Sequence, residues 1–156
     1  MNWNEFKSNV ERWAEERGIY EHSTPEAQLL KALSELGELA DAVVKNDREA
    51  LKDAIGDVAV CMVNYAKMAG VVFPEEPASG RPAYSDEHII SVMCSMLGCA
   101  LKGFKSYGDN RDFARALSAI AFNNSLDFLD CCAAAWHEIK DRKGFLSKSG
   151  AFIKEE

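Results

Sequence analysis

Residues 29–58 read LLKALSELGELADAVVKNDREALKDAIGDV, and this stretch decides the fold. Apolar residues recur every three or four positions before and after the polar segment KNDRE at 45–49, a pattern typical of two amphipathic helices joined by a short turn. Helices joined by so short a turn lie antiparallel to each other. The stretch therefore predicts a helical hairpin.

The first helix of the hairpin has a clear start, and the second has a clear end. Thr24 is the expected N-cap and Pro25 the first helical residue, while Gly70 is expected to end a second helix over 48–69. The first helix is expected to bury one apolar stripe. That stripe is Leu29, Leu33, Leu36, Ala40 and Val43.

Helical periodicity also extends over most of the remaining chain. It predicts helices at 2–17, at 86–104 and at 110–141, the last with a break near 122–125. No alternating strand pattern of useful length occurs, so the expected class is all-α. Residues 1–156 are expected to form one domain, in which a loop at about 71–84 holds three of the four prolines and separates two helical halves.

The two halves show a weak internal similarity. Residues 89–120 repeat the order of helix, polar turn and helix seen in 29–58, and Leu97-Gly98 aligns with Leu36-Gly37. One interpretation is a duplicated pair of hairpins, in which Met96 and Cys99 replace Glu35 and Glu38. Chance similarity between two amphipathic hairpins is the alternative.

Composition narrows the class of function. The net charge of −7 argues against non-specific nucleic-acid binding, which requires a basic surface. The chain lacks an apolar run of membrane-spanning length and begins with a charged amphipathic segment, so a cytoplasmic location is expected. The five cysteines form no C-x-x-C pair, so most are expected to be small buried residues.

Polar residues interrupt the apolar pattern of the hairpin at corresponding places. One side of the first helix carries Gln28, Lys31, Glu35 and Glu38. One stripe of the second helix, which is apolar almost all round between 58 and 63, carries Asp53, Asp57, Asn64 and Lys67. Because buried charges are costly unless paired or bound to metal, the two stripes are expected to face each other.

A magnesium site would explain four converging carboxylates. Glu35, Glu38, Asp53 and Asp57 would repel one another, and a divalent cation offsets that repulsion. Hard oxygen ligands suit Mg²⁺, with Mn²⁺ as an alternative, and Mg²⁺ keeps positions open for substrate phosphates. Phosphoryl chemistry on a nucleotide or another polyphosphate is the predicted reaction type. An ordinary solvated helix face is the alternative interpretation of Glu35 and Glu38.

These residues resemble the MazG-like, all-α nucleoside triphosphate pyrophosphohydrolases, in particular phage-type members. The family pattern is E-x-x-E followed on the next helix by E-x-x-D. ELGE at 35–38 matches the first pair, and DAIGD at 53–57 supplies Asp57 in the usual G-D-V context. Ala54 stands where the family has its third glutamate, and Asp53, one residue earlier, is a candidate replacement.

The resemblance implies hydrolysis of a nucleoside triphosphate to the monophosphate and pyrophosphate. It implies Mg²⁺ held by Glu35, Glu38 and Asp57, with Asp53 as a further ligand, and a general base that is either Glu35 or Glu38. Gln28, Lys31, Asn64 and Lys67 would contact the substrate or the metal-bound water. The C-terminal segment WHEIKDRKGF is also similar to the family, and there Lys140, Arg142 and Lys143 would contact phosphates. A cationic helix end that complements the helix dipole is the alternative for these three residues.

The resemblance leaves alternatives open. Family members commonly form dimers or tetramers, so a homo-oligomer is expected. A narrower dUTPase/dCTPase-type enzyme or a phosphoribosyl-ATP pyrophosphohydrolase fits the same motifs. Ala54 favours a third alternative, a non-catalytic helical module that binds nucleotides or other proteins. Trp3, Trp13 and Trp136 are either stacking platforms for a base or parts of the core.

Overall fold

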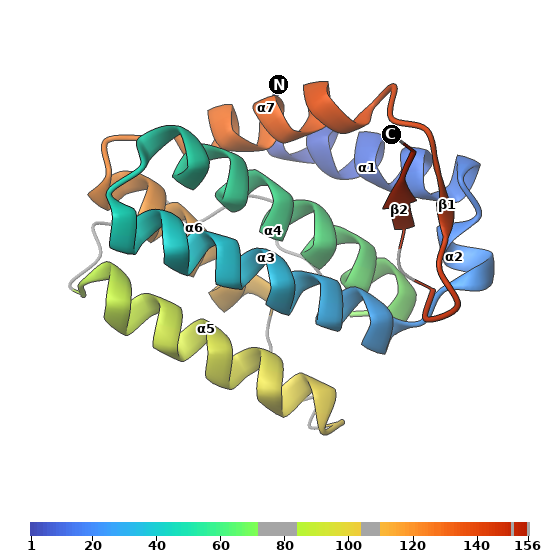
Figure 1. Cartoon of the computed structure of the whole chain (residues 1–156), viewed down its shortest axis with the longest axis horizontal. Helices are drawn as coiled ribbons and strands as arrows, with labels where there is room; N and C mark the ends of the chain where they lie inside the picture. Colours follow the sequence, from blue (N-terminus) through green and yellow to red (C-terminus); the bar gives the residue numbers. More distant parts are fainter. Residues whose placement is uncertain (72–83, 104–109, 151, 156) are drawn as a thin grey trace.

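The predicted hairpin is present as α3 (Pro25–Lys45) and α4 (Arg48–Ala69), which run antiparallel side by side (Figure 1). The Thr24 hydroxyl accepts a hydrogen bond from the amide of Ala27 at 3.1 Å and caps α3 as predicted. Asn46 has a φ of 52° and turns the chain, after which the Asp47 carboxylate caps α4. The polar segment at 45–49 therefore acts as the turn that the sequence indicated.

The computed structural model describes residues 1–71, 84–103, 110–150 and 152–155. Most of the expected loop at 71–84 lies outside these ranges. The remaining elements are α1 (Trp3–Glu16), α2 (Ile19–His22), α5 (Asp86–Leu101), α6 (Asn110–Asn123), α7 (Phe128–Ile139), β1 (Gly144–Leu146) and β2 (Phe152–Lys154). The expected break near 122–125 is confirmed, because α6 ends at Asn123 and Asp127 caps α7.

The hairpin is the centre of the bundle. In Figure 1, α1 and α7 lie together along one side of α4, while α5 lies along α3 and α6 packs near α4 and α5. The fully buried side chains come from all of these helices, among them Phe6, Leu36, Ile55, Met93 and Phe113. The all-α class is therefore confirmed, with α4 buried on most of its surface.

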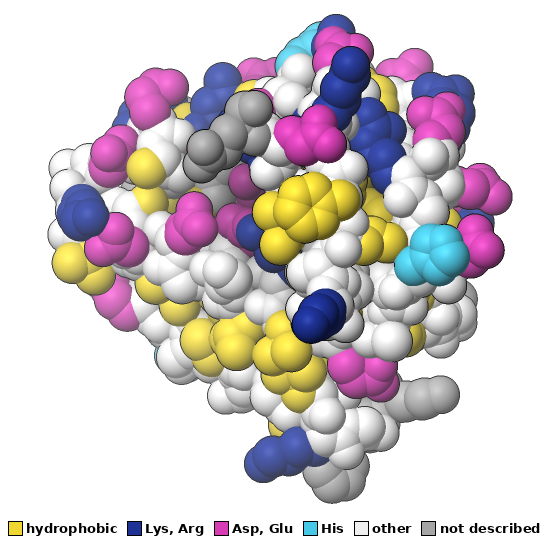
Figure 2. All heavy atoms as spheres, turned by 45° about the vertical axis from the view of Figure 1, so that its right-hand side comes forward, with side chains coloured by type: hydrophobic (Ala, Val, Ile, Leu, Met, Phe, Trp, Pro, Cys, Tyr) yellow, Lys and Arg dark blue, Asp and Glu magenta, His cyan; other side chains and the backbone are white. Residues whose placement is uncertain are grey.

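A short two-stranded sheet follows α7 and was not predicted. β1 and β2 pair antiparallel, with Phe145 opposite Ile153, and they lie near α2 and the start of α3 (Figure 1). Phe152 makes an edge-on contact with Trp13 of α1, with ring centroids 5.3 Å apart. Acidic, basic and hydrophobic side chains are interspersed over this side of the molecule (Figure 2). Strands of three residues carry too little pattern to be recognised from sequence.

The buried face of α3 differs from the predicted stripe. Leu33 is 40% exposed, whereas Gln28 and Glu35 are buried beside Leu29, Ala32 and Leu36. The helix is therefore rotated so that part of its polar side faces the interior. The prediction assigned burial to apolar residues alone, and it was wrong at Leu33 because two polar residues occupy the protein-facing side.

The two halves share some local features. Leu36 and Leu97 are each 1% exposed, and a Cβ placed on either Gly37 or Gly98 would meet nothing within 4 Å. The aligned leucines are thus equally buried on α3 and α5, while Gly37 is exposed and Gly98 is half-buried. The second half lacks the carboxylates of the first, since Met96 and Cys99 occupy the aligned positions and are partly buried. Descent from a duplication stays a prediction.

Candidate functional site

Polar residues from both helices of the hairpin line one cavity of about 80 Å³. The predicted site residues among its walls are Gln28, Lys31, Glu35, Asp57, Asn64 and Arg142. Apolar walls come from α1, α2, α4, α7 and β2. Residues that are distant in sequence are therefore brought together, and the volume is sufficient for only part of a nucleotide.

The spacing of these residues gives the cavity two ends. Gln28 and Glu35 are seven residues apart on α3, and Asp57 and Asn64 are seven residues apart on α4, which corresponds to about 10 Å along each helix. Because the helices are antiparallel, Glu35 lies at the level of Asp57, and Gln28 lies at the level of Asn64. One end therefore carries carboxylates, and the other carries side-chain amides.

At the carboxylate end, Glu35 forms an ion pair with Lys31 one turn earlier on α3. The Glu35 residue is 4% exposed, so its charge depends on partners within the protein. Burial on its own would lower the pKa of Lys31, but the hydrogen bond and charge of Glu35 raise it overall. Lys31 therefore stays protonated beside the carboxylate.

Asp57 has the most altered acidity in the cavity. The pKa of Asp57 is raised to about 7, first by burial and then by the negative charges of Glu35, Asp53 and Glu138, against an opposing effect of Arg142. The pKa of Asp53 is also raised, first by burial and then by the charge and hydrogen bond of Glu138. Negative charge in this region thus exceeds what the neighbouring cations offset.

Glu138 is the acidic residue that the sequence analysis missed. It lies on the last turn of α7, forms an ion pair with Arg142 and interacts with both Asp53 and Asp57. Its i,i+4 spacing to Arg142 was visible in WHEIKDRKGF. Nothing in the sequence indicated that α7 would pack against this part of α4.

Arg17 fixes the segment that carries Arg142. Its guanidinium donates hydrogen bonds to the carbonyl oxygen of Arg142 at 2.9 and 3.0 Å and to that of Lys140 at 3.2 Å. These bonds join the end of α1 to the residues that follow α7. Arg142 is thereby held at the cavity although it lies beyond the helix.

At the amide end, both side chains are buried and hydrogen bonded. The Tyr20 hydroxyl donates to Asn64 Oδ1 at 2.9 Å, and Gln28 Nε2 donates to Ser23 Oγ at 3.1 Å. These bonds orient the two amides from Tyr20 of α2 and from Ser23, which directly follows α2. The amide end is therefore preorganised by direct hydrogen bonds to neighbouring side chains.

The other predicted site residues do not line the cavity. Glu38 is exposed on α3, Asp53 is exposed on α4, and Lys67 pairs with Glu11 at 3.1 Å. Lys140 and Lys143 are exposed after α7. Ala54 is 3% exposed and belongs to the core, so position 54 contributes no polar group to the site.

The donor chemistry of the carboxylate end suits a hard divalent cation. Within the described residues, however, no group of three or more His, Cys, Asp or Glu side chains is already arranged to hold a metal ion. Lys31 and Arg142 pair with Glu35 and Glu138 instead. Holding a metal would require these carboxylates to exchange a cationic side chain for the ion.

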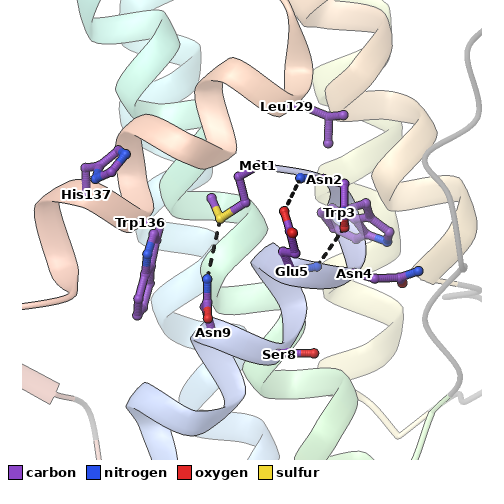
Figure 3. A pocket seen from close by; sticks show the side chains of 10 residues that line it. All are labelled: Met1, Asn2, Trp3, Asn4, Glu5, Ser8, Asn9, Leu129, Trp136 and His137. Atoms are coloured by element: carbon purple, nitrogen blue, oxygen red, sulfur yellow. Dashed lines mark hydrogen bonds between the residues drawn. The ribbon is translucent and has the colours of Figure 1, made fainter.

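A second, more open groove of about 1050 Å³ lies between the start of α1 and α7 (Figure 3). It contains the capping box of α1, in which Asn2 and Glu5 exchange hydrogen bonds at 2.9 Å, and it is bordered by Trp136 and His137. The described residues around it include Trp3 and Trp136, two of the candidates for base stacking, but none of the predicted metal ligands or charged and amide substrate contacts. The groove is therefore separate from the charged cavity.

The fold and the cavity define an all-α protein whose central hairpin carries a buried charged site. Residues 23–73, which include α3 and α4, match the family model for the MazG nucleotide pyrophosphohydrolase domain. The resemblance found in the sequence is therefore confirmed over this segment, and the matched domain is a nucleotide pyrophosphohydrolase domain.

A phage protein is also similar to part of the chain. The chain is 49% identical over 59 residues to an uncharacterised 18.2 kDa protein from the rep-hol intergenic region of Haemophilus phage HP1, strain HP1c1. The alignment covers 38% of this chain and 36% of the phage protein, so it spans about a third of that relative's length. No solved structure matches the chain significantly.

None of the helices in the described part of the chain has the length and apolar character needed to cross a membrane.

The altered acidity of Asp57 predicts a measurable pH dependence of stability. A carboxyl with a pKa of about 7 in the folded protein and 3.8 in the unfolded chain binds its proton more tightly when folded. Without divalent cations, the contribution of Asp57 to the free energy of unfolding is therefore fully present below about pH 4. It is lost progressively as the pH rises to about 7, and it does not change further above that pH. We therefore expect the melting temperature of Asp57→Asn minus that of wild type to increase as the pH rises from about 4 to about 7.

Thermal melts in EDTA at several pH values measure this difference. Asp41→Asn is the control, because Asp41 is exposed on α3 and its ion-pair partner among the described residues is Lys45. Its difference from wild type should stay nearly constant over the same interval. A constant difference for Asp57→Asn would show that Asp57 is not perturbed as described.

Proposed function

We propose that this protein hydrolyses nucleoside triphosphates to the nucleoside monophosphate and pyrophosphate in the presence of Mg²⁺, with Mn²⁺ as an alternative metal. The observation that carries the proposal is the cavity in which Glu35 and Asp57 meet Lys31 and Arg142. The match of residues 23–73 to a nucleotide pyrophosphohydrolase domain supports it.

Carboxylates of the hairpin and of α7 would hold the metal. Glu35 and Asp57 are the central ligands, and Glu38 lies one turn further along α3. Asp53 and Glu138 together would take the place of the glutamate missing at Ala54, since their carboxylates interact. When bound, the metal would offset phosphate charge and lower the pKa of a coordinated water.

The remaining charged residues would bind the phosphates and assist proton transfer. Lys31 and Arg142 line the cavity and would pair with phosphate oxygens in place of Glu35 and Glu138. Lys140, Lys143 and Lys67 are exposed and would act only on parts of the substrate outside the cavity. Of the two candidate general bases, Glu35 is favoured, because it lines the cavity whereas Glu38 is exposed.

A non-catalytic nucleotide-binding module is the second candidate. Two observations favour it, the buried alanine at position 54 and the lack of a ready metal-binding group among the described residues. The narrower enzymes, a dUTPase/dCTPase-type pyrophosphatase and a phosphoribosyl-ATP pyrophosphohydrolase, would use the same cavity. Association into a homo-oligomer stays a prediction. The exposed Leu30 and Leu33 on α3 favour it, because a subunit interface would bury them.

A triphosphate panel tests the proposal. We expect pyrophosphate release from at least one common or modified nucleoside triphosphate when Mg²⁺ or Mn²⁺ is present, and none in EDTA. The substrate preferred in the panel separates the broad enzyme from the narrower ones. Calorimetric titration with a non-hydrolysable triphosphate is run in parallel. Binding without turnover would favour the module. The absence of both binding and turnover would refute the proposed function.

A further inference from the structure

Trp13 has a buried hydrogen-bond donor without a partner. The residue is 5% exposed and lines the charged cavity from α1. Its indole Nε1 is buried, and the described residues offer it no hydrogen-bond acceptor. Buried polar groups are nearly always satisfied, so an unpaired N–H on a residue that lines a cavity requires an explanation.

The ring of Trp13 is already packed by other side chains. The Arg17 guanidinium carbon lies 4.8 Å from the ring centroid, over its face, and Phe152 contacts the ring edge-on. These contacts leave little of the ring surface for a stacked base. The polar edge, Nε1–H, is the part of the side chain that still lacks a partner.

We propose that Trp13 Nε1–H donates a hydrogen bond to the nucleobase of a bound nucleoside triphosphate, at a carbonyl oxygen or a ring nitrogen. This inference rests on the proposed function. An uncharged donor beside Ile19 and Phe152 suits an uncharged acceptor, whereas Lys31 and Arg142 provide charged donors for phosphates. Trp13 is therefore assigned to substrate selection.

The amide end of the cavity supports this assignment. Asn64 is buried and accepts from Tyr20 through Oδ1, so its Nδ2 group remains to donate to a ligand. The amide end lies about 10 Å along the hairpin from the carboxylate end, as expected if the triphosphate and the base occupy different parts of the site. Trp13 and Asn64 would then supply two uncharged donors to one base.

Trp13→Phe in the full chain tests the assignment, because phenylalanine keeps an aromatic ring and removes the N–H. With Mg²⁺ present, we expect the Kd of a non-hydrolysable nucleoside triphosphate to rise about tenfold, the effect of one lost buried hydrogen bond. The Kd of inorganic tripolyphosphate should not change. The melting temperature without ligand should fall only modestly, because the loss of packed ring atoms is partly offset by the removal of an unpaired buried donor.

Trp136→Phe is the matched control, since Trp136 borders the separate groove between α1 and α7 (Figure 3). It should leave both Kd values unchanged. Equal weakening of nucleotide and tripolyphosphate binding by Trp13→Phe would assign Trp13 a structural role and overturn the inference. Unchanged nucleotide binding would overturn it while leaving the proposed function intact.

Measurements on the wild-type protein decide two further cases. If Trp13→Phe does not fold, the indole N–H resonances are followed by NMR, with Trp3→Phe and Trp136→Phe used to assign the other two of the three tryptophans. The Trp13 resonance should shift on addition of the nucleoside triphosphate and not of tripolyphosphate, and identical shifts with both would overturn the inference. A wild type that binds no nucleoside triphosphate would refute the proposed function and this inference with it.

Discussion

Glu35→Gln is expected to reduce metal-dependent pyrophosphate release by at least about a hundredfold, the usual loss when a positioned general base is removed. Glu35 is the buried carboxylate of α3 in the cavity, and it is proposed both as a metal ligand and as the base. Glutamine keeps the shape of the side chain but removes the charge. Steady-state kinetics on the substrate selected from the triphosphate panel measures the loss.

The charge of Lys31 has to be considered in the interpretation. Lys31 loses its ion-pair partner in Glu35→Gln, but its amine is only partly buried and can reach solvent. We therefore expect circular dichroism to show an intact helical fold. A variant with normal secondary structure and wild-type activity would exclude Glu35 from catalysis.

Two comparison variants make the Glu35 result specific. Asp41→Asn removes an exposed carboxylate from the same helix and should leave activity unchanged. Glu38→Gln tests the other candidate base, which is exposed and does not line the cavity. A smaller loss in Glu38→Gln than in Glu35→Gln would assign the base to Glu35, whereas the reverse order would assign it to Glu38.

The hairpin was predictable because its signals are local. Thr24 and Pro25 at the start of α3, and Gly70 with a φ of 64° after α4, act through bonds and backbone angles within one turn of helix. Glu35 and Asp57 then lie at the same level of the hairpin, because they are similarly far from the turn on two antiparallel helices. Both features depend on the sequence between 23 and 70 alone.

The rest of the cavity depends on contacts between distant segments. Arg142 reaches the site because Arg17, at the opposite end of the chain, binds the carbonyl groups after α7. Glu138 approaches Asp53 only because α7 packs on α4. The rotation of α3 was misjudged for a different reason, since Gln28 and Glu35 are buried with the nearby partners Ser23 and Lys31, which the apolar pattern did not reveal.

Gly56→Ala is expected to destabilise the protein by roughly 1–3 kcal/mol, the typical cost of overpacking a core. A Cβ at position 56 would lie 2.6 Å from the Cys131 carbonyl oxygen and 2.6 Å from Ala135 Cβ, closer than real contacts allow. One of these atoms belongs to the backbone of α7, so the two helices would have to separate. At about 2–4 °C per kcal/mol for a chain of this size, the melting temperature should fall by several degrees.

Gly37→Ala is the matched control and should act in the opposite direction. Gly37 is an exposed position inside α3 where a new Cβ meets nothing within 4 Å, so alanine should add about 0.5–1 kcal/mol through helix propensity alone. Chemical denaturation of both variants measures the two changes. Because α7 carries Glu138 and is followed by Arg142, Gly56→Ala should also weaken triphosphate binding at temperatures where the protein is fully folded, and Gly37→Ala should not. Equal stability of the two variants would show that α4 and α7 are not packed as closely as Gly56 implies.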